Sequence, residues 1–124
     1  MSGPSPLLVQ YVNDVAVVTF NQATLIETRD IEHVREELNE MVDRRAQRRM
    51  ILDLGKVQLL SSSALGVLIP LRDKFAKLKR GQLVLCGVRP EIRRVFKITK
   101  LEKRFCFCKT EADALAKMGL SMPT

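Results

Sequence analysis

The stretch LLSSSALGVL, which spans Leu59 to Leu68, decides how this sequence is organised. It joins a predicted buried strand, Met50 to Leu54, to the most apolar helical pattern of the chain. Three consecutive serines stand at the junction, where the first N–H groups of a helix have no intrahelical acceptor. A serine that caps such a helix contributes about 1 kcal/mol. One cap is sufficient, so the remaining hydroxyls are candidates for an exposed functional site.

The segment after the serines predicts a mostly buried helix. Its apolar residues at helical spacing are Ala64, Leu68, Leu71, Phe75 and Leu78, and Leu65, Val67 and Ile69 widen the face. Pro70 removes one helical hydrogen bond, so we expect a bend near Gly66. Gly81 is expected to end the helix at the C′ position.

The residues before this stretch predict a hairpin and a surface helix. Leu7 to Tyr11 and Val15 to Phe20 are β-rich, and Asn13-Asp14 suits the turn between them. Asn21 to Arg29 reads as a loop. The following helix has Thr28 or Asp30 as its expected cap, and its apolar stripe consists of Ile31, Val34, Leu38, Met41 and Val42.

The residues after the stretch predict two further strand–helix units. Gln82 to Cys86 and Arg104 to Cys108 are the expected strands. Pro90 suits the first turn of a helix that carries Ile92, Val95 and Phe96; Thr110 is the expected cap of a last helix, with Ala114, Leu115 and Met118 inward and Gly119 at its end. The order ββαβαβαβα indicates an α/β fold with a mainly parallel sheet, in which functional sites tend to lie at the carboxyl ends of strands.

Length and composition indicate a single domain. The 124 residues are 46% hydrophobic and 28% charged, which is ordinary for a globular protein. No apolar run reaches the ~18 residues of a membrane span, so we expect no membrane insertion. We expect residues 1–6 to be a disordered lead-in without the features of a signal peptide, 7–118 to be the domain, and 119–124 to be frayed; the location is expected to be cytoplasmic.

The net charge of +7 is compatible with nucleic acid, an acidic membrane or an acidic protein as a partner. Two of three basic clusters are expected to close predicted helices, where cations in the last turn complement the helix dipole. The clusters are Arg44, Arg45, Arg48 and Arg49; Lys74, Lys77, Lys79 and Arg80; and, in a third region, Arg89, Arg93, Arg94, Lys97, Lys100, Lys103 and Arg104. With one Tyr and no Trp, base-stacking side chains are scarce, which argues against nucleic-acid binding.

The remaining residues argue against an enzyme. His33 is the only histidine, and no nucleophile elbow or phosphate-binding glycine loop is present. Asp53 and Asp73 offer no obvious carboxylate pair. Cys86, Cys106 and Cys108 are an odd number without metal-ligand spacing, so they read as small buried strand residues. We therefore expect no cofactor, metal or disulfide framework.

The segment from Leu52 to Leu68 resembles the signature of STAS domains, the sulphate-transporter and anti-sigma-factor-antagonist fold. That signature is a strand ending Asp-Leu-Ser, followed by Val-x-Phe-Ile/Met-Asp-Ser-Ser-Gly-Leu-Gly. Gly81 to Val88, Ile92 to Phe105 and Thr110 to Leu115 are similar to the family's later strand and helices. The resemblance covers Leu7 to Met118. It implies a mixed sheet of about five strands packed with about four helices.

The resemblance also implies a function. Stand-alone STAS proteins of this kind are anti-sigma factor antagonists, which bind a serine-kinase anti-sigma factor and are inactivated by phosphorylation. It implies Ser63 as phosphoacceptor, with Ser62 as the alternative, in a partner-binding edge of Ser61, Ser62, Ser63, Ala64 and Leu65. Ser61 replaces the family's acidic residue and Ala64 its glycine.

Two alternatives remain open at this stage. One is a STAS scaffold module that binds partners without being phosphorylated. The other is a nucleotide or nucleic-acid binder that uses the basic region Arg89 to Arg104. For each of these functions, the antagonist included, we expect a monomer or a weak dimer.

Overall fold

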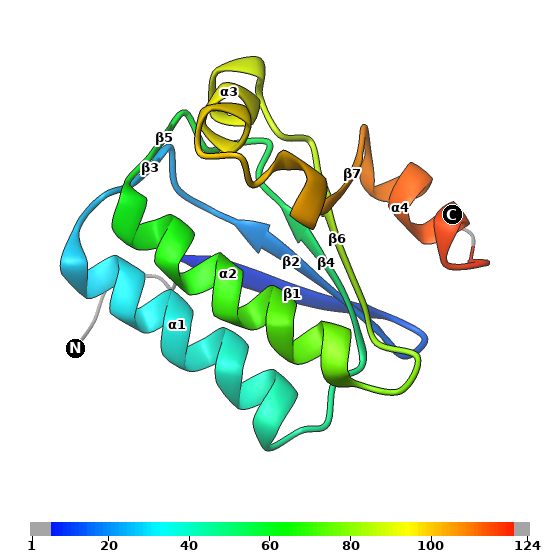
Figure 1. Ribbon diagram of the computed structural model, residues 1–124. Helices are drawn as coiled ribbons and strands as arrows, with labels where there is room; N and C mark the ends of the chain where they lie inside the picture. The colour runs from blue at the N-terminus through cyan, green and yellow to red at the C-terminus, as the bar shows by residue number, and fades with distance from the viewer. Residues whose placement is uncertain (1–5, 121–124) are drawn as a thin grey trace.

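A five-stranded mixed sheet forms the centre of the protein (Figure 1), as seen in a computed structural model that describes residues 6–120. The strand order is β1-β2-β4-β6-β7; β1 is antiparallel to β2, and the other neighbours are parallel. The strands are β1 (Leu7–Val12), β2 (Val15–Phe20), β3 (Thr24–Leu25), β4 (Arg49–Asp53), β5 (Leu59–Leu60), β6 (Gln82–Cys86) and β7 (Cys106–Cys108). The helices are α1 (Thr28–Asp43), α2 (Ser62–Lys77), α3 (Pro90–Ile98) and α4 (Glu111–Lys117), with a 3₁₀ turn η1 (Glu102–Arg104).

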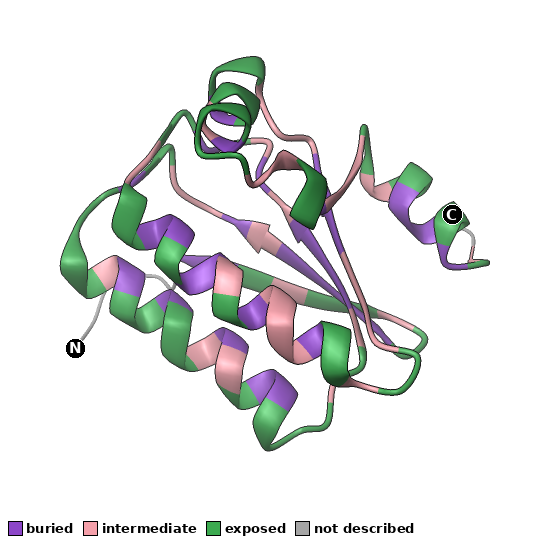
Figure 2. Cartoon of the chain, viewed as in Figure 1, coloured by how far each residue is buried: buried purple, intermediate pink, exposed green. Residues whose placement is uncertain are grey.

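The helices bury both faces of the sheet (Figure 2). Helices α1, α2 and α3 contribute to the larger apolar core, and α4 packs on the opposite face. Alternate residues of β4 therefore point into different cores: Met50 and Leu52 into the larger one and Ile51 into the smaller, each 0% exposed. This confirms the prediction that the Met50–Leu54 run is covered on both faces. The predicted stripe of α1 is also buried throughout.

The N-terminal hairpin forms as predicted. Val12 pairs with Val15, which leaves Asn13 and Asp14 as a two-residue turn. Asn13 has a φ of 54°, a left-handed conformation that asparagine tolerates better than most residues. Pro6, which precedes β1, is buried, and its carbonyl accepts a hydrogen bond of 2.8 Å from Asn21 N. The predictions for residues 1–5 and 121–124 lie outside the described residues.

The helix starts were predicted with mixed success. Thr110 accepts a hydrogen bond from Asp113 N at 3.1 Å, and Pro90 occupies the first position of α3, both as expected. The cap predicted for α1 is wrong: its N-cap is Glu27, which makes no side-chain capping bond. Tertiary packing of the apolar stripe supports this helix, so it does not depend on a strong cap.

The end of α2 also differs from prediction. The helix runs through Gly66 and Pro70 as one element and is followed by Leu78 in extended conformation. Arg80, not Gly81, has a positive φ, at 61°. A glycine is nevertheless required at position 81, because a Cβ there would lie 2.3 Å from Phe75 O. The reason is close backbone approach at the helix end, not a left-handed C′ residue.

The structure contains a short two-stranded sheet that was not predicted from the sequence. Strand β3, inside the predicted loop from Asn21 to Arg29, pairs in parallel with β5, so that Thr24 faces Leu59 and Leu25 faces Leu60. Strand β7 was predicted two residues too long at its start, because Arg104 belongs to η1. These elements contain two or three residues each, too few to show a periodic pattern.

Candidate functional site

The entry to α2 is held in place by the segment around β3. Gln58 N and Leu59 N donate to Ala23 O at 2.7 and 3.2 Å, and Ser61 N donates to Leu25 O at 3.1 Å. The backbone that leads into the serines is therefore tied to a segment more than thirty residues earlier in the chain. The backbone that carries the serines is therefore fixed by hydrogen bonds and is not a free loop.

The three serines have different environments. Ser61 is the N-cap of α2, and its Oγ accepts a hydrogen bond of 3.2 Å from Ala64 N. Ser62 and Ser63 occupy the first two helical positions, and both are exposed. The spare hydroxyls inferred from the sequence are thus present on the surface. Ala64 and Leu65 are 1% and 4% exposed and pack into the core.

The charge at this helix end favours an anion. The first N–H groups of α2 have no intrahelical acceptor, and the helix dipole adds partial positive charge there. The first turn of α2 contains no acidic residue. A phosphate on an adjacent hydroxyl would therefore meet no like charge from that turn.

Two exposed apolar residues lie beside the serines and were missed by the sequence. Leu59, in β5, is 55% exposed, and Ile26, directly after β3, is 50% exposed. Leu59 belongs to the β3–β5 ladder that leads into α2, and Ile26 directly follows the β3 side of that ladder. Exposed apolar surface with a polar rim is one feature of protein-interaction sites. We call Ile26, Leu59, Ser62 and Ser63 the serine edge.

A pair of carboxyl groups that the sequence did not predict lies where β4 ends and α4 begins. Asp53, which ends β4, accepts a hydrogen bond of 2.9 Å from Gly55 N, and Glu111 begins α4. The hydrogen bond between the two carboxyl groups, followed by burial and the charge of Asp53, raises the pKa of Glu111 to about 7. Asp73, the partner considered from sequence, is instead paired with Arg72. The Glu111 carboxyl group therefore keeps its proton to a higher pH than an ordinary glutamate does.

The third basic region is partly engaged in structural contacts. The Arg93 guanidinium lies 3.8 Å from the Phe107 ring centroid and donates to Glu102 at 3.1 Å. The rings of Phe96, Phe105 and Phe107 pack against one another in the core. Aromatic rings held in this way are not free to stack on bases. This region therefore has the basic residues of a single-strand nucleic-acid site but not the free aromatic rings that such a site needs to stack on bases.

The cysteines lie on strands, as predicted. All three are free; Cys86 is buried, and Cys106 and Cys108 are half-buried in β7. Burial, with smaller effects from nearby acidic groups, raises the pKa of Cys86 to about 12, so its thiol is unreactive at neutral pH. Among residues 6–120, no three His, Cys, Asp or Glu side chains come together in a way that could hold a metal ion. No helix in that part of the chain is long and apolar enough to cross a membrane.

Residues 8–114 match the STAS domain family, and the chain belongs to that family. Its fold agrees with solved members. The unphosphorylated anti-sigma factor antagonist SpoIIAA superposes with a TM-score of 0.78 at 18% identity, over 94% of this chain and 99% of that one. An anti-sigma factor antagonist from Mycobacterium paratuberculosis superposes with a TM-score of 0.77 at 24% identity, over 97% and 100% of the two chains.

Within the family, the chain is of the anti-sigma factor antagonist type. The anti-sigma F factor antagonist of Paenibacillus polymyxa is 31% identical over 85 residues, which are 68% of this chain and 72% of that protein. A Bordetella bronchiseptica protein that is provisionally named an anti-sigma factor antagonist is 29% identical over 99 residues, 80% of this chain and 84% of the relative. Proteins of this type are regulators and not enzymes.

Proposed function

We propose that this protein binds a serine-kinase anti-sigma factor through the serine edge and is released by phosphorylation of Ser63. The observation that carries the proposal is the exposure of Ser63 at the second position of α2, next to a cap that Ser61 already supplies. Ser63 is free of a capping role, so its hydroxyl is available for modification. Ser62, exposed one residue earlier, is the alternative acceptor.

A phosphate at this position would change the edge sharply. It carries about −1.5 to −2 charges at neutral pH and three acceptor oxygens. The apolar side chains of Ile26 and Leu59 in the same edge offer a partner a surface that excludes water. Adding a hydrated dianion to such a contact opposes binding, whereas the helix end itself tolerates the charge. The physical effect is therefore on the partner and not on the fold.

The two departures from the family pattern leave this geometry intact. Serine and aspartate are comparable helix caps, and Ser61 performs the capping that an acidic residue would. Ala64 lies in regular helix without a positive φ, so no special glycine backbone is needed there. The interface we propose leaves out the side chains of Ala64 and Leu65, because both are buried. They position the backbone of the edge.

The direct test is to incubate the protein with its cognate anti-sigma kinase and ATP and to map the phosphate by mass spectrometry. We expect a single phosphate on Ser63, which Ser63→Ala abolishes and Ser62→Ala preserves. Binding of the kinase to Ser63→Asp should be at least tenfold weaker than to wild type. Unmodified serines together with undiminished binding of Ser63→Asp would refute the switch.

A constitutive scaffold is the second candidate. It is favoured by Ser61, which stands two residues before Ser63 at the position where the family pattern has an acidic residue. The apolar part of the serine edge distinguishes the two. Leu59→Ser should weaken partner binding in both cases, whereas Ser63→Asp weakens it only if the edge is a switch. Leu8→Ser is the matched control, because Leu8 is similarly exposed (51%) but lies on edge strand β1.

A further inference from the structure

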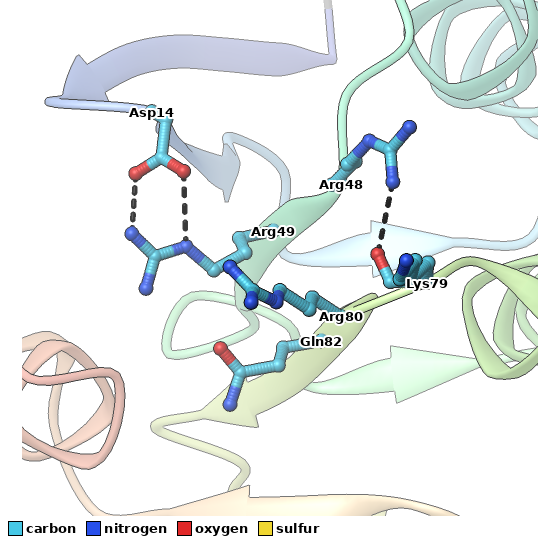
Figure 3. A pocket seen from close by; sticks show the side chains of 6 residues that line it. All are labelled: Asp14, Arg48, Arg49, Lys79, Arg80 and Gln82. Carbon is cyan, nitrogen blue, oxygen red and sulfur yellow. Dashed lines mark hydrogen bonds and ion pairs between the residues drawn. The ribbon is translucent and has the colours of Figure 1, made fainter.

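A basic hollow lies at the edge of the sheet where β4 and β6 begin (Figure 3). Its volume is about 890 Å³, and it is lined by Asp14, Arg48, Arg49, Lys79, Arg80 and Gln82. Four cations and one carboxylate make its formal charge +3. The residues come from the β1–β2 turn, from the chain entering β4 and from the α2–β6 connection with the first residue of β6, so only the tertiary structure brings them together.

Helix dipoles do not account for these cations, contrary to the sequence interpretation. Helix α1 has no basic residue in its last turn, and α2 has only Lys74 and Lys77 there. Lys74 is already bound to Asp43 at 2.7 Å. The cations of the hollow lie beyond the helix ends, outside the turn over which the dipole acts. Their accumulation needs another explanation.

The cations differ in how far they are engaged. All three guanidinium nitrogens of Arg49 are engaged: Nε and Nη2 donate to the two carboxylate oxygens of Asp14, and Nη1 donates to Met118 O at 3.0 Å. Arg48 uses only Nη1, which donates to Lys79 O at 3.0 Å. The Lys79 and Arg80 side chains are exposed, with no hydrogen-bond or ion-pair partner among residues 6–120. Arg48, Lys79 and Arg80 thus line one hollow and have N–H donors that are not used within the described part of the chain.

We propose that this hollow binds an acidic polypeptide segment of a protein partner. A carboxylate is already held there by two parallel bonds from Arg49, the geometry in which guanidinium groups recognise carboxylates. The lining contains no aromatic residue on which a nucleobase could stack. Helices α1 and α2 present their carboxyl ends at this edge, so no helix N-terminal N–H groups are available to hold a phosphate. Separate cations around a hollow match carboxylates spaced along a peptide.

The proposed site is separate from the serine edge. Helix α2 runs from the serines to the α2–β6 connection, and its 16 residues span roughly 24 Å at 1.5 Å per residue. An acidic segment in the hollow would therefore leave Ser63 and its apolar neighbours uncovered. The protein could hold two partners at once, which goes beyond the function proposed above.

The test uses a ten-residue fluorescein-labelled peptide of alternating glutamate and serine, titrated by fluorescence anisotropy, with a glutamine–serine peptide as the uncharged probe. We expect the glutamate peptide alone to bind, and binding to weaken as salt rises. The triple variant Arg48→Gln, Lys79→Gln, Arg80→Gln should bind at least tenfold more weakly. Asp14→Asn should bind more tightly, because it frees the guanidinium of Arg49.

The matched control removes three exposed charges from the α3–η1 region, in the triple variant Arg94→Gln, Lys97→Gln, Lys103→Gln. It should weaken binding less than threefold. Equal losses in both triple variants would show attraction by net charge alone and overturn the proposal, as would a glutamate peptide that does not bind. Tighter binding of tripolyphosphate or of a thymidine oligonucleotide through the same three residues would overturn the ligand class.

Circular dichroism establishes that each variant is folded. If the triple variant does not fold, Arg80→Gln alone is sufficient, because that side chain is exposed and makes no contact that the fold requires. We expect a two- to fourfold loss of peptide affinity in that variant. An unchanged affinity would overturn the proposal. Ser63→Asp should bind the peptide as wild type does, since its site is at the other end of α2.

Discussion

Replacing Ser61 by alanine separates the structural role of the serine cluster from its proposed regulatory role. Ser61 Oγ accepts a hydrogen bond of 3.2 Å from Ala64 N, whereas Ser62 and Ser63 are exposed. Alanine at position 61 removes the Oγ acceptor of the Ala64 N–H group. The structure therefore predicts that one serine of the three contributes to stability and that the other two do not.

The magnitude follows from the capping geometry. Loss of a serine cap costs about 0.5–2 kcal/mol. Ala64 N also lies 3.1 Å from Ser61 O, so the donor keeps one acceptor, and we expect about 0.5–1 kcal/mol. Unfolding entropy is about 2.1 cal/mol/K per residue, so a chain of 124 residues has about 0.26 kcal/mol/K. The melting temperature should fall by about 2–4 °C.

The assay uses circular dichroism to monitor the thermal and urea unfolding of three variants, Ser61→Ala, Ser62→Ala and Ser63→Ala. Ser62→Ala and Ser63→Ala should lie within about 0.5 kcal/mol of wild type, as for ordinary surface substitutions. Ser61→Asp should retain full stability, because aspartate also caps and its charge is favourable at a helix start. A loss in Ser63→Ala as large as in Ser61→Ala, or no loss in Ser61→Ala, would refute the assignment of roles.

Two further predictions concern glycines and pH. Gly81→Ala should lower the free energy of unfolding by about 1–3 kcal/mol, because its Cβ would lie 2.3 Å from Phe75 O; Gly66→Ala, with nothing within 4 Å, should raise it by up to about 1 kcal/mol. Urea unfolding measures the free energy of unfolding of both variants, and a change in the same direction in both would contradict this explanation. The hydrogen bond with Asp53 is the main cause that raises the pKa of Glu111 from 4.5 to about 7. The protonated Glu111 carboxyl group therefore contributes to the free energy of unfolding in full below pH 4.5, and this contribution is lost as pH rises through 7. Glu111→Gln should match wild type at pH 5 and exceed it by about 1 kcal/mol at pH 8, after allowance for solvent screening; urea unfolding that shows no gain at pH 8 would contradict it.

Most of the core was predictable because periodicity survives in sequence. The stripe of α1 and the continuous apolar run of β4 each identified residues that are buried in the structure. Caps with a side-chain mechanism, such as Thr110, were also predictable. Where packing replaces local chemistry, as at Glu27 before α1, the same rules pointed to the wrong residue.

The candidate site was only partly predictable. The serines were recognised because three hydroxyls exceed what one helix start needs. Ile26 and Leu59 were missed because β3 and β5 contain two residues each and are defined only by pairing with one another. The carboxyl pair of Asp53 and Glu111 was missed for a similar reason, since the two residues meet only where β4 ends beside α4.

The sequence by itself determined the class of fold, the order of the main strands and helices, and the position of the serine junction, because burial imposes a repeating pattern on each of these elements. Tertiary structure alone decided which serine caps, which hydroxyls are exposed and which apolar residues join them at the serine edge. It also placed the cations of two connections around one hollow with Asp14. These features depend on contacts between residues far apart in the chain, and no local pattern records such contacts.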